Sequence, residues 1–360
     1  MAGRCVSCGT IAAVGLLAVA LAIVGGCASP QPKADLAWYP APPAAAHVVH
    51  LLSFNSLHDI VPARVHWVDM FRGAPVSPHV DTPAGVAFGQ GRLYICDTQV
   101  NAVHAWELAT GEARSVGGGG DAPLGEPVDV AVDEQGVIYV ADTGRGEVVA
   151  FGLDGSVVGK YSPAGGDADY RPVGLAVGGE RLYVADAGSH RVLVFSTIDG
   201  RLVGTFGSAG AEPGQFFLPM DVIVDGGGQV FVADMMNSRV QVFDADGRFL
   251  RSMGRPGDRY GDLGKPKRVA VAPDGVIFIA DPSFAHVHLF NSQGQLLMLL
   301  GGPEQKPGGT PMPAGVTIAE TLPQRLTALV PETFEADYFL FVTNTIGPKR
   351  ISLYAVGRQR

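Results

Sequence analysis

Two residues after each of six regularly spaced prolines stands a glycine or a charged residue. These positions are Gly85, Asp129, Gly174, Asp221, Arg268 and Gly315. Two carboxylates and one guanidinium among three glycines form a polar site with room to bind a small charged ligand or a loop of another protein. The same charges could instead pair with one another inside the protein, because buried charges normally find partners. The sequence leaves both interpretations open.

Metal chemistry would need several ligands that converge. His286 and His288 alternate along one predicted strand and His190 lies in a loop, so three converging histidines are not visible. Asp129 and Asp221 could hold a divalent ion, although Arg268 at the same level opposes a cation. No nucleophile beside a base can be read from the sequence. We expect no catalytic residue, no metal and no cofactor, with a metal-dependent hydrolase or lyase as the alternative.

The elements that would position these residues repeat every 44 to 47 residues. The prolines are Pro83, Pro127, Pro172, Pro219, Pro266 and Pro313. A polar residue ends the second strand of each unit, at Asp97, Asp142, Asp186, Asp234, Asp281 and Asn344. Three residues before it stands an aromatic, at Tyr94, Tyr139, Tyr183, Phe231, Phe278 and Phe341. The third strand carries another, at Trp106, Phe151, Phe195, Phe243, Phe290 and Tyr354. This period, with four strands per unit, indicates the blades of a β-propeller.

The way the ring closes can also be predicted. The first five units end with a tight turn and a fourth apolar strand, but the sixth has no room for one after Tyr354. Residues 47–54, HVVHLLSF, look like such an outer strand and belong to no unit. The sequence therefore predicts an all-β, six-bladed β-propeller of four-stranded antiparallel blades, closed by this N-terminal strand in the last blade. We expect the propeller to span residues 47–360, with short helices within 59–71 and 318–336.

Propeller geometry places the starts of the first strands and the loops after the second strands on one face. Those loops differ between blades and supply further candidates, at Arg145, His190, Met235, Asn237 and Phe284. Variable loops with exposed apolar side chains favour a protein or peptide partner on this channel face, although ordinary loop divergence would look the same. The aspartates that end the second strands are expected to cap their own turns by accepting backbone N–H bonds.

The N-terminus predicts export. Arg4, the apolar run from Ile11 to Val24 and the glycines after it are typical of a signal peptide over residues 1–26, and the run is shorter than the roughly 20 residues of a membrane span. Val24-Gly25-Gly26-Cys27 resembles the lipobox of bacterial lipoproteins, which implies lipidation of Cys27 and a membrane anchor. An ordinary cleavage site and a short N-terminal membrane helix are the alternatives. Residues 27–46, rich in proline and alanine, would be a tether.

The charge balance argues against nucleic acid. The chain has 26 basic and 35 acidic residues, for a net charge of −9, and phosphate binding depends on clustered lysine and arginine. Cys96 lies one residue before a strand end and is expected to be a small buried side chain.

The repeated motifs point to a known family. Pro-x-x-Val, then YVADT or FVADM, then an arginine that starts the third strand resemble the NHL-repeat propellers over residues 83–354. The arginine is present at Arg191, Arg239 and Arg350 and absent from the other three blades. With the lipobox, the chain resembles exported bacterial NHL-repeat lipoproteins, some encoded beside multihaem cytochromes. The resemblance implies a binding scaffold in the cell envelope, with the outer membrane favoured because Ala28 is not aspartate. Gluconolactonase-like and amidating-lyase-like propellers are the enzymatic alternatives.

Overall fold

A computed structural model describes residues 36–40, 44–45, 47–61, 79–117, 123–304 and 306–360. They belong to one compact unit, Asp35–Arg360. The predicted signal peptide, Cys27, most of the tether and most of the predicted helix within 59–71 lie outside the described residues. One short 3-10 helix, η1 (Leu57–Asp59), ends at the residue where that predicted helical stretch begins. In the described part of the chain, no helix is long and apolar enough to cross a membrane.

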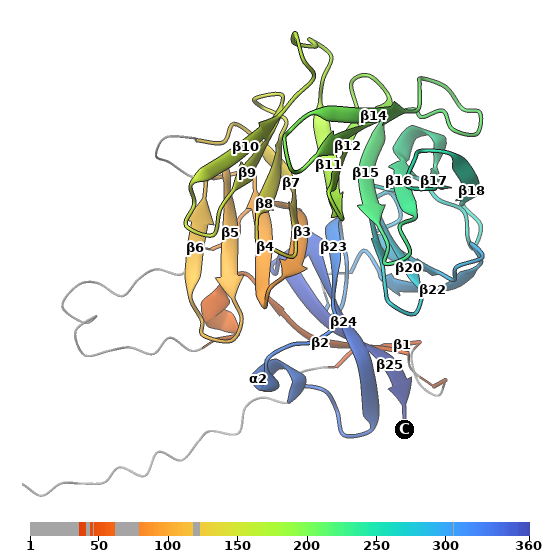
Figure 1. Ribbon diagram of the computed structural model, residues 1–360. Helices are drawn as coiled ribbons and strands as arrows, with labels where there is room; N and C mark the ends of the chain where they lie inside the picture. The colour runs from red at the N-terminus through yellow and green to blue at the C-terminus, as the bar shows by residue number, and fades with distance from the viewer. Residues whose placement is uncertain (1–35, 41–43, 46, 62–78, 118–122, 305) are drawn as a thin grey trace, which may run out of the picture. The chain divides into compact units, whose positions relative to one another are not determined.

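The described residues form six antiparallel sheets, the blades of a six-bladed β-propeller (Figure 1). Five have four strands in sequence order. Blade one holds β3 (Pro83–Gly89), β4 (Arg92–Asp97), β5 (Ala102–Glu107) and β6 (Ala113–Val116), and blade two holds β7 (Pro127–Val132), β8 (Ile138–Asp142), β9 (Glu147–Phe151) and β10 (Val157–Tyr161). Blade three holds β11 (Pro172–Gly178), β12 (Arg181–Asp186), β13 (Arg191–Ser196) and β14 (Leu202–Phe206). Blade four holds β15 (Pro219–Val224), β16 (Val230–Asp234), β17 (Arg239–Phe243) and β18 (Phe249–Met253), with η2 (Met235–Asn237) after β16. Blade five holds β19 (Arg268–Val271), β20 (Ile277–Asp281), β21 (His286–Phe290) and β22 (Leu296–Gly301).

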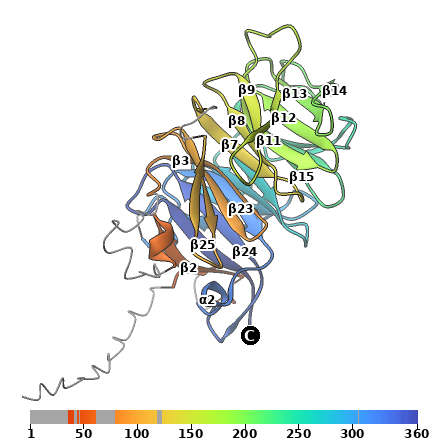
Figure 2. The same cartoon turned by 60° about the vertical axis from the view of Figure 1, so that its left-hand side comes forward.

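The sixth blade joins the two ends of the described chain. Its strands run in the order β1 (Trp38–Tyr39), β2 (Val48–Phe54), β25 (Ile351–Gln359), β24 (Phe334–Asn344) and β23 (Pro313–Ala319). Strand β2 pairs antiparallel with β25, as Figure 2 shows, so the predicted closing strand is confirmed. Strand β1 lies in the stretch that the sequence indicated as tether. The short helix α2 (Gln324–Thr327) falls in the predicted insertion of this blade.

The core lies between neighbouring blades, because one sheet cannot bury both of its faces alone. The twelve aromatics of the two repeated columns are all between 0% and 3% exposed. They belong to six apolar clusters that join neighbouring blades. At the closure, Phe54 of β2 lies 6.3 Å from Trp106 of blade one, between ring centroids. The closing strand is thus held both by its ladder and by the next blade's core.

The aspartates that end the second strands are buried, and those of blades one, two, three and five make the predicted caps, whereas Asp234 accepts no backbone N–H of its own turn within the residues that the structure describes. In blade two, Asp142 accepts the Arg145 N–H at 3.2 Å, and it also accepts the Gly125 and Glu126 N–H groups at 2.7 and 2.8 Å. This carboxylate therefore ties its own turn to the loop that precedes the first strand of the blade. The sequence did not reveal this second attachment. Asn344, the sixth member of the column, has no side-chain hydrogen bond among the described residues.

The packing predicts that the closing strand carries much of the stability. Phe54→Ala should lower the free energy of unfolding by about 3–5 kcal/mol, because a fully buried aromatic leaves a cavity. Phe217→Ala is the matched control: Phe217 is 48% exposed, and we expect a change within about 0.5 kcal/mol. Urea unfolding followed by circular dichroism measures both. Equal losses in the two variants would contradict the role given to β2.

Candidate functional site

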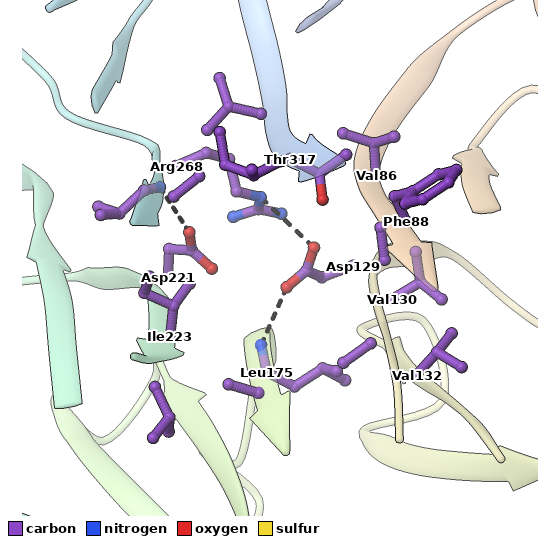
Figure 3. A pocket seen from close by; sticks show the side chains of 18 of the residues that line it. Val86, Phe88, Asp129, Val130, Val132, Leu175, Asp221, Ile223, Arg268 and Thr317 are labelled. Atoms are coloured by element: carbon purple, nitrogen blue, oxygen red, sulfur yellow. Dashed lines mark hydrogen bonds and ion pairs between the residues drawn. The ribbon is translucent and has the colours of Figure 1, made fainter. Parts of the chain in front are cut away.

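Three charged side chains converge in the central channel. Asp129 comes from β7, Asp221 from β15 and Arg268 from β19, the innermost strands of blades two, four and five. Each stands two residues after the repeated proline, where the innermost strand turns a side chain toward the axis. Figure 3 shows the two carboxylates and the guanidinium pointing toward one another from these three strands. They are 3% to 5% exposed, so the contacts that they make determine what they can do.

Arg268 joins four blades. Its terminal nitrogens donate to the carbonyl oxygens of Met220 at 2.6 Å, Val128 at 2.8 Å and Val173 at 3.1 Å. Its Nε lies 3.6 Å from Asp129 Oδ1. These acceptors belong to blades two, three and four, and Arg268 itself belongs to blade five. The guanidinium is thus a crosslink at the axis, and charge-assisted bonds to carbonyl groups compensate its burial.

Each carboxylate also bonds to the backbone of the next blade. Asp129 Oδ2 accepts the Leu175 N–H at 2.9 Å, and Asp221 Oδ2 accepts the Val269 N–H at 2.7 Å. Burial raises the pKa of Asp129, against the opposing effect of Arg268. Burial likewise raises the pKa of Asp221, to about 8, with the same opposition. Burial therefore favours the protonated form of Asp221.

The glycines do not leave the room that the sequence suggested. A Cβ on Gly85 would lie 2.2 Å from Asp129 Oδ1, and one on Gly174 would lie 2.5 Å from the Asp221 Cα. The space beside each of these glycines is taken by the aspartate of the following blade. Glycine is needed at these positions for close approach of neighbouring strands.

A divalent cation does not fit this set of residues. The Arg268 guanidinium lies against the Asp129 carboxylate and would oppose a second cation there. His286 and His288 have ring centroids 6.4 Å apart, while His190 lies in another blade. Among the residues that the structure describes, no three histidine, cysteine, aspartate or glutamate side chains gather to hold a metal. Cys96 is fully buried, and burial raises the pKa of its thiol well above the usual value.

A cavity of about 260 Å³ lies in the channel beyond these charges, toward the ends of the first strands. Its floor is Asp129, Asp221 and Arg268. Its walls include one apolar side chain per blade, which together we call the apolar collar: Phe88, Val132, Val177, Val224, Val271 and Ile318. The cavity therefore lies on the side away from the face where the sequence placed the site. The sequence does contain a pattern that marks the apolar collar, because each collar residue is the fifth after the repeated proline.

On the predicted face, three of the five loop candidates are engaged in internal bonds. Arg145 donates to Glu147 Oε1 and to the Pro123 carbonyl, both at 2.8 Å. Asn237 donates to the Gly210 carbonyl at 2.9 Å and to Asp234 at 2.8 Å. His190 Nδ1 accepts the Leu218 N–H at 3.1 Å. These side chains hold the loops after the second strands against the loops that precede the first strands.

Exposed apolar side chains lie beside these bonds. Phe217 is 48% exposed and Met236 is 45% exposed. The Met236 N–H donates to the Phe217 carbonyl at 3.0 Å, and the Phe217 ring lies 5.4 Å from that of His190. We call Phe217, Met236 and His190 the rim patch. The predicted candidate Met235 is half-buried beside it. Sequence reasoning missed Phe217, since it directly follows the fully buried Phe216 and is identical in type.

Phe284, the last candidate, belongs to blade five. It is half-buried, with its ring 6.0 Å from that of His288. It lies on the loop after β20 and takes no part in the rim patch.

Comparisons with known proteins agree with this architecture. Residues 124–151 and 170–195, which hold the first three strands of blades two and three, match the NHL repeat. The chain is a six-bladed β-propeller that contains NHL repeats in blades two and three. The solved structures that resemble this NHL propeller include a streptogramin B lyase, at 11% identity and a TM-score of 0.54, covering 77% of this chain and 94% of the lyase. A gluconolactonase from Xanthomonas campestris has 16% identity and a TM-score of 0.55, covering 87% and 90% of the two chains. At these identities the likeness concerns the fold alone.

The channel geometry predicts a structural role for Arg268. Arg268→Met should lower the free energy of unfolding of the NHL propeller by about 3–5 kcal/mol, because it leaves Asp129 and three carbonyl groups buried without their donor. Arg114→Met, at a side chain that is 64% exposed, should change it by no more than about 0.5 kcal/mol. Thermal and urea unfolding test this. An Arg268→Met protein as stable as the wild type would refute the crosslink.

Proposed function

We propose that this NHL propeller is an exported, lipid-anchored scaffold that binds a protein or peptide partner through the rim patch. The observation that carries the proposal is the solvent exposure of the Phe217 side chain. Large apolar side chains that are half-exposed on adjacent loops at a rim are typical of the centre of a binding surface. The occupant we propose is a loop or extended segment of one partner protein that covers Phe217 and Met236 with apolar side chains.

The backbone beside Phe217 supports this interpretation. Leu218 has a φ of +65°, in the left-handed region that bulky residues rarely adopt. Such a conformation costs on the order of 1 kcal/mol and persists only where the surroundings impose it. His190 imposes it here by accepting the Leu218 N–H. The strained turn buries Phe216 and presents Phe217, which is the arrangement expected of a positioned contact residue.

The partner is proposed to belong to the cell envelope. The lipobox-like Val24–Cys27 favours a lipid anchor at Cys27 and an extracytoplasmic position, with the outer membrane favoured by Ala28. The resemblance to NHL lipoproteins encoded beside multihaem cytochromes makes a cytochrome-containing assembly the first place to look. The ion pair between Arg268 and Asp129 favours a scaffold over a metal-dependent hydrolase or lyase, because a cation already lies against one of the two carboxylates.

A site-specific crosslink tests the rim patch. With a photoreactive amino acid at Met236, the full-length protein should crosslink to one partner in its own membranes, and Phe217→Ser should reduce that product at least about tenfold. The matched control is Val203→Ser: Val203 is 57% exposed on the outer strand β14 and should leave the product unchanged. A product that survives Phe217→Ser, or that forms equally from a probe at Val203, would contradict the proposal.

The anchor has its own test. Cys27→Ala should move the protein from the membrane fraction to the soluble fraction, because the lipid chains would have no attachment point. Fractionation and mass spectrometry of the mature N-terminus measure this. A Cys27→Ala protein that stays in the membrane fraction would indicate that another segment holds it there.

A further inference from the structure

The cavity that ends on Asp129, Asp221 and Arg268 has the features of a binding site. It opens on the face opposite the rim patch. Its space of about 260 Å³ is lined by the apolar collar, opens to solvent at its mouth and ends on buried polar groups. Apolar walls with a few converging polar groups are characteristic of small-ligand sites. Figure 3 shows Val86, Phe88, Val130, Val132 and Ile223 around the space into which Asp129 and Asp221 point.

Of the two carboxyl groups in the floor, Asp129 has a cationic partner and Asp221 has none in the part of the chain that the structure describes. The terminal nitrogens of Arg268 are bonded to backbone carbonyls, and its Nε faces Asp129. Asp221 is 3% exposed and forms no ion pair within 4 Å among the described residues. Its Oδ2 is taken by the Val269 N–H, which leaves Oδ1 available to the cavity. A buried carboxyl in this position needs either a proton or a positively charged ligand.

The surface around the cavity mouth is acidic. Two grooves of about 710 and 510 Å³ adjoin the mouth, since they share Val177, Val224, Val271 and Ile318 with its collar. The carboxylates that line them are Glu134, Glu180, Asp225, Asp246 and Glu320, and Arg181 is the basic side chain among the lining residues. Arg181 is paired with Asp246 at 3.1 Å. The field at the mouth therefore attracts cations.

We propose that the cavity binds an alkylammonium group, such as the side chain of a lysine, with its aliphatic chain inside the apolar collar and its ammonium on Asp221. The four methylene groups of a lysine side chain would pack against the apolar walls, whereas a bare metal ion has no apolar part to contact them. A peptide carrying the lysine could continue into the acidic grooves. This site is separate from the rim patch, so either proposal can fail without the other.

Binding has a defined proton balance. In the free protein burial raises the pKa of Asp221 and so favours its protonated form. The ammonium binds the carboxylate form, so one proton passes from Asp221 to solvent and no covalent bond changes. The charged groups that act on Asp221 are Arg268 and Asp129, and Lys267 and Cys96 act in turn on these two. The lining residues of β3, β11 and β23 include none. Affinity should therefore rise with pH between about 6 and 8.

The experiment compares ligands that differ only in charge. Calorimetric titration of the full-length protein with n-butylamine and with 1-butanol should show amine binding at least about tenfold tighter. The peptide Gly-Lys-Gly, compared with Gly-norleucine-Gly, tests the lysine source. Peptide binding tighter than that of butylamine supports an extended peptide in the grooves, and equal binding supports a free amine of the same chemistry.

Variants locate the site. Asp221→Asn keeps the size of the side chain and an acceptor for Val269, so it should fold, yet it should weaken amine binding at least about tenfold. Glu320→Gln, an exposed acid beside the mouth, is the matched control and should change binding by less than about threefold. Ile318→Trp fills the collar without altering charge and should block both the amine and the alcohol.

Three results would overturn the proposal. They are equal affinity for butylamine and butanol, unchanged amine binding in both Asp221→Asn and Ile318→Trp, and no amine binding at millimolar concentration.

Discussion

The close approach of the innermost strands at the channel axis constrains the rest of the propeller. Neighbouring strands lie so near one another that Gly85 and Gly174 have no space for a Cβ. The aspartates of the following blades fill that space, and their burial calls for a countercharge. Arg268 supplies it for Asp129, and its reach to the carbonyls of three other blades makes the axis a single bonded unit. The polar groups that first suggested chemistry are thus largely occupied in holding the ring.

Because these charged side chains close the channel axis, the two faces of the propeller present different surfaces. On the face where the first strands begin, the loops are bonded to one another and present an apolar rim patch. On the other face, the channel remains hollow, apolar in its walls and acidic at its mouth. A protein partner and a small cationic group therefore suit different ends of the same ring. Loops that differ between blades surround one end of the channel, and the repeated apolar collar surrounds the other.

Much of the fold could be predicted because the repeat is encoded locally. The aromatic columns that include Trp106 and Tyr354 reveal the repeat by counting, and the structure buries them. The closing strand followed from a missing fourth strand in the sixth unit. Strand β1 could not be predicted, since two residues just before a proline gain their structure only by pairing with β2. The contacts of Arg268 depend on distances across the ring that sequence spacing does not give. Phe216 is buried and Phe217 exposed because of the direction in which the backbone turns, and residue type does not reveal that direction.

The pairing of β2 with β25 has a consequence for how the protein is made. Val48 pairs with Val356, so a strand synthesised early waits for a partner near the end of the chain. Until then β2 is an apolar segment with an unpaired edge, and the ring stays open between blades one and six. Earlier blades can assemble on one another as they emerge, since their contacts are with sequence neighbours. The nascent chain therefore remains an open arc until its last strand is made, and whatever handles it during synthesis has to keep the edge of β2 from pairing with another copy.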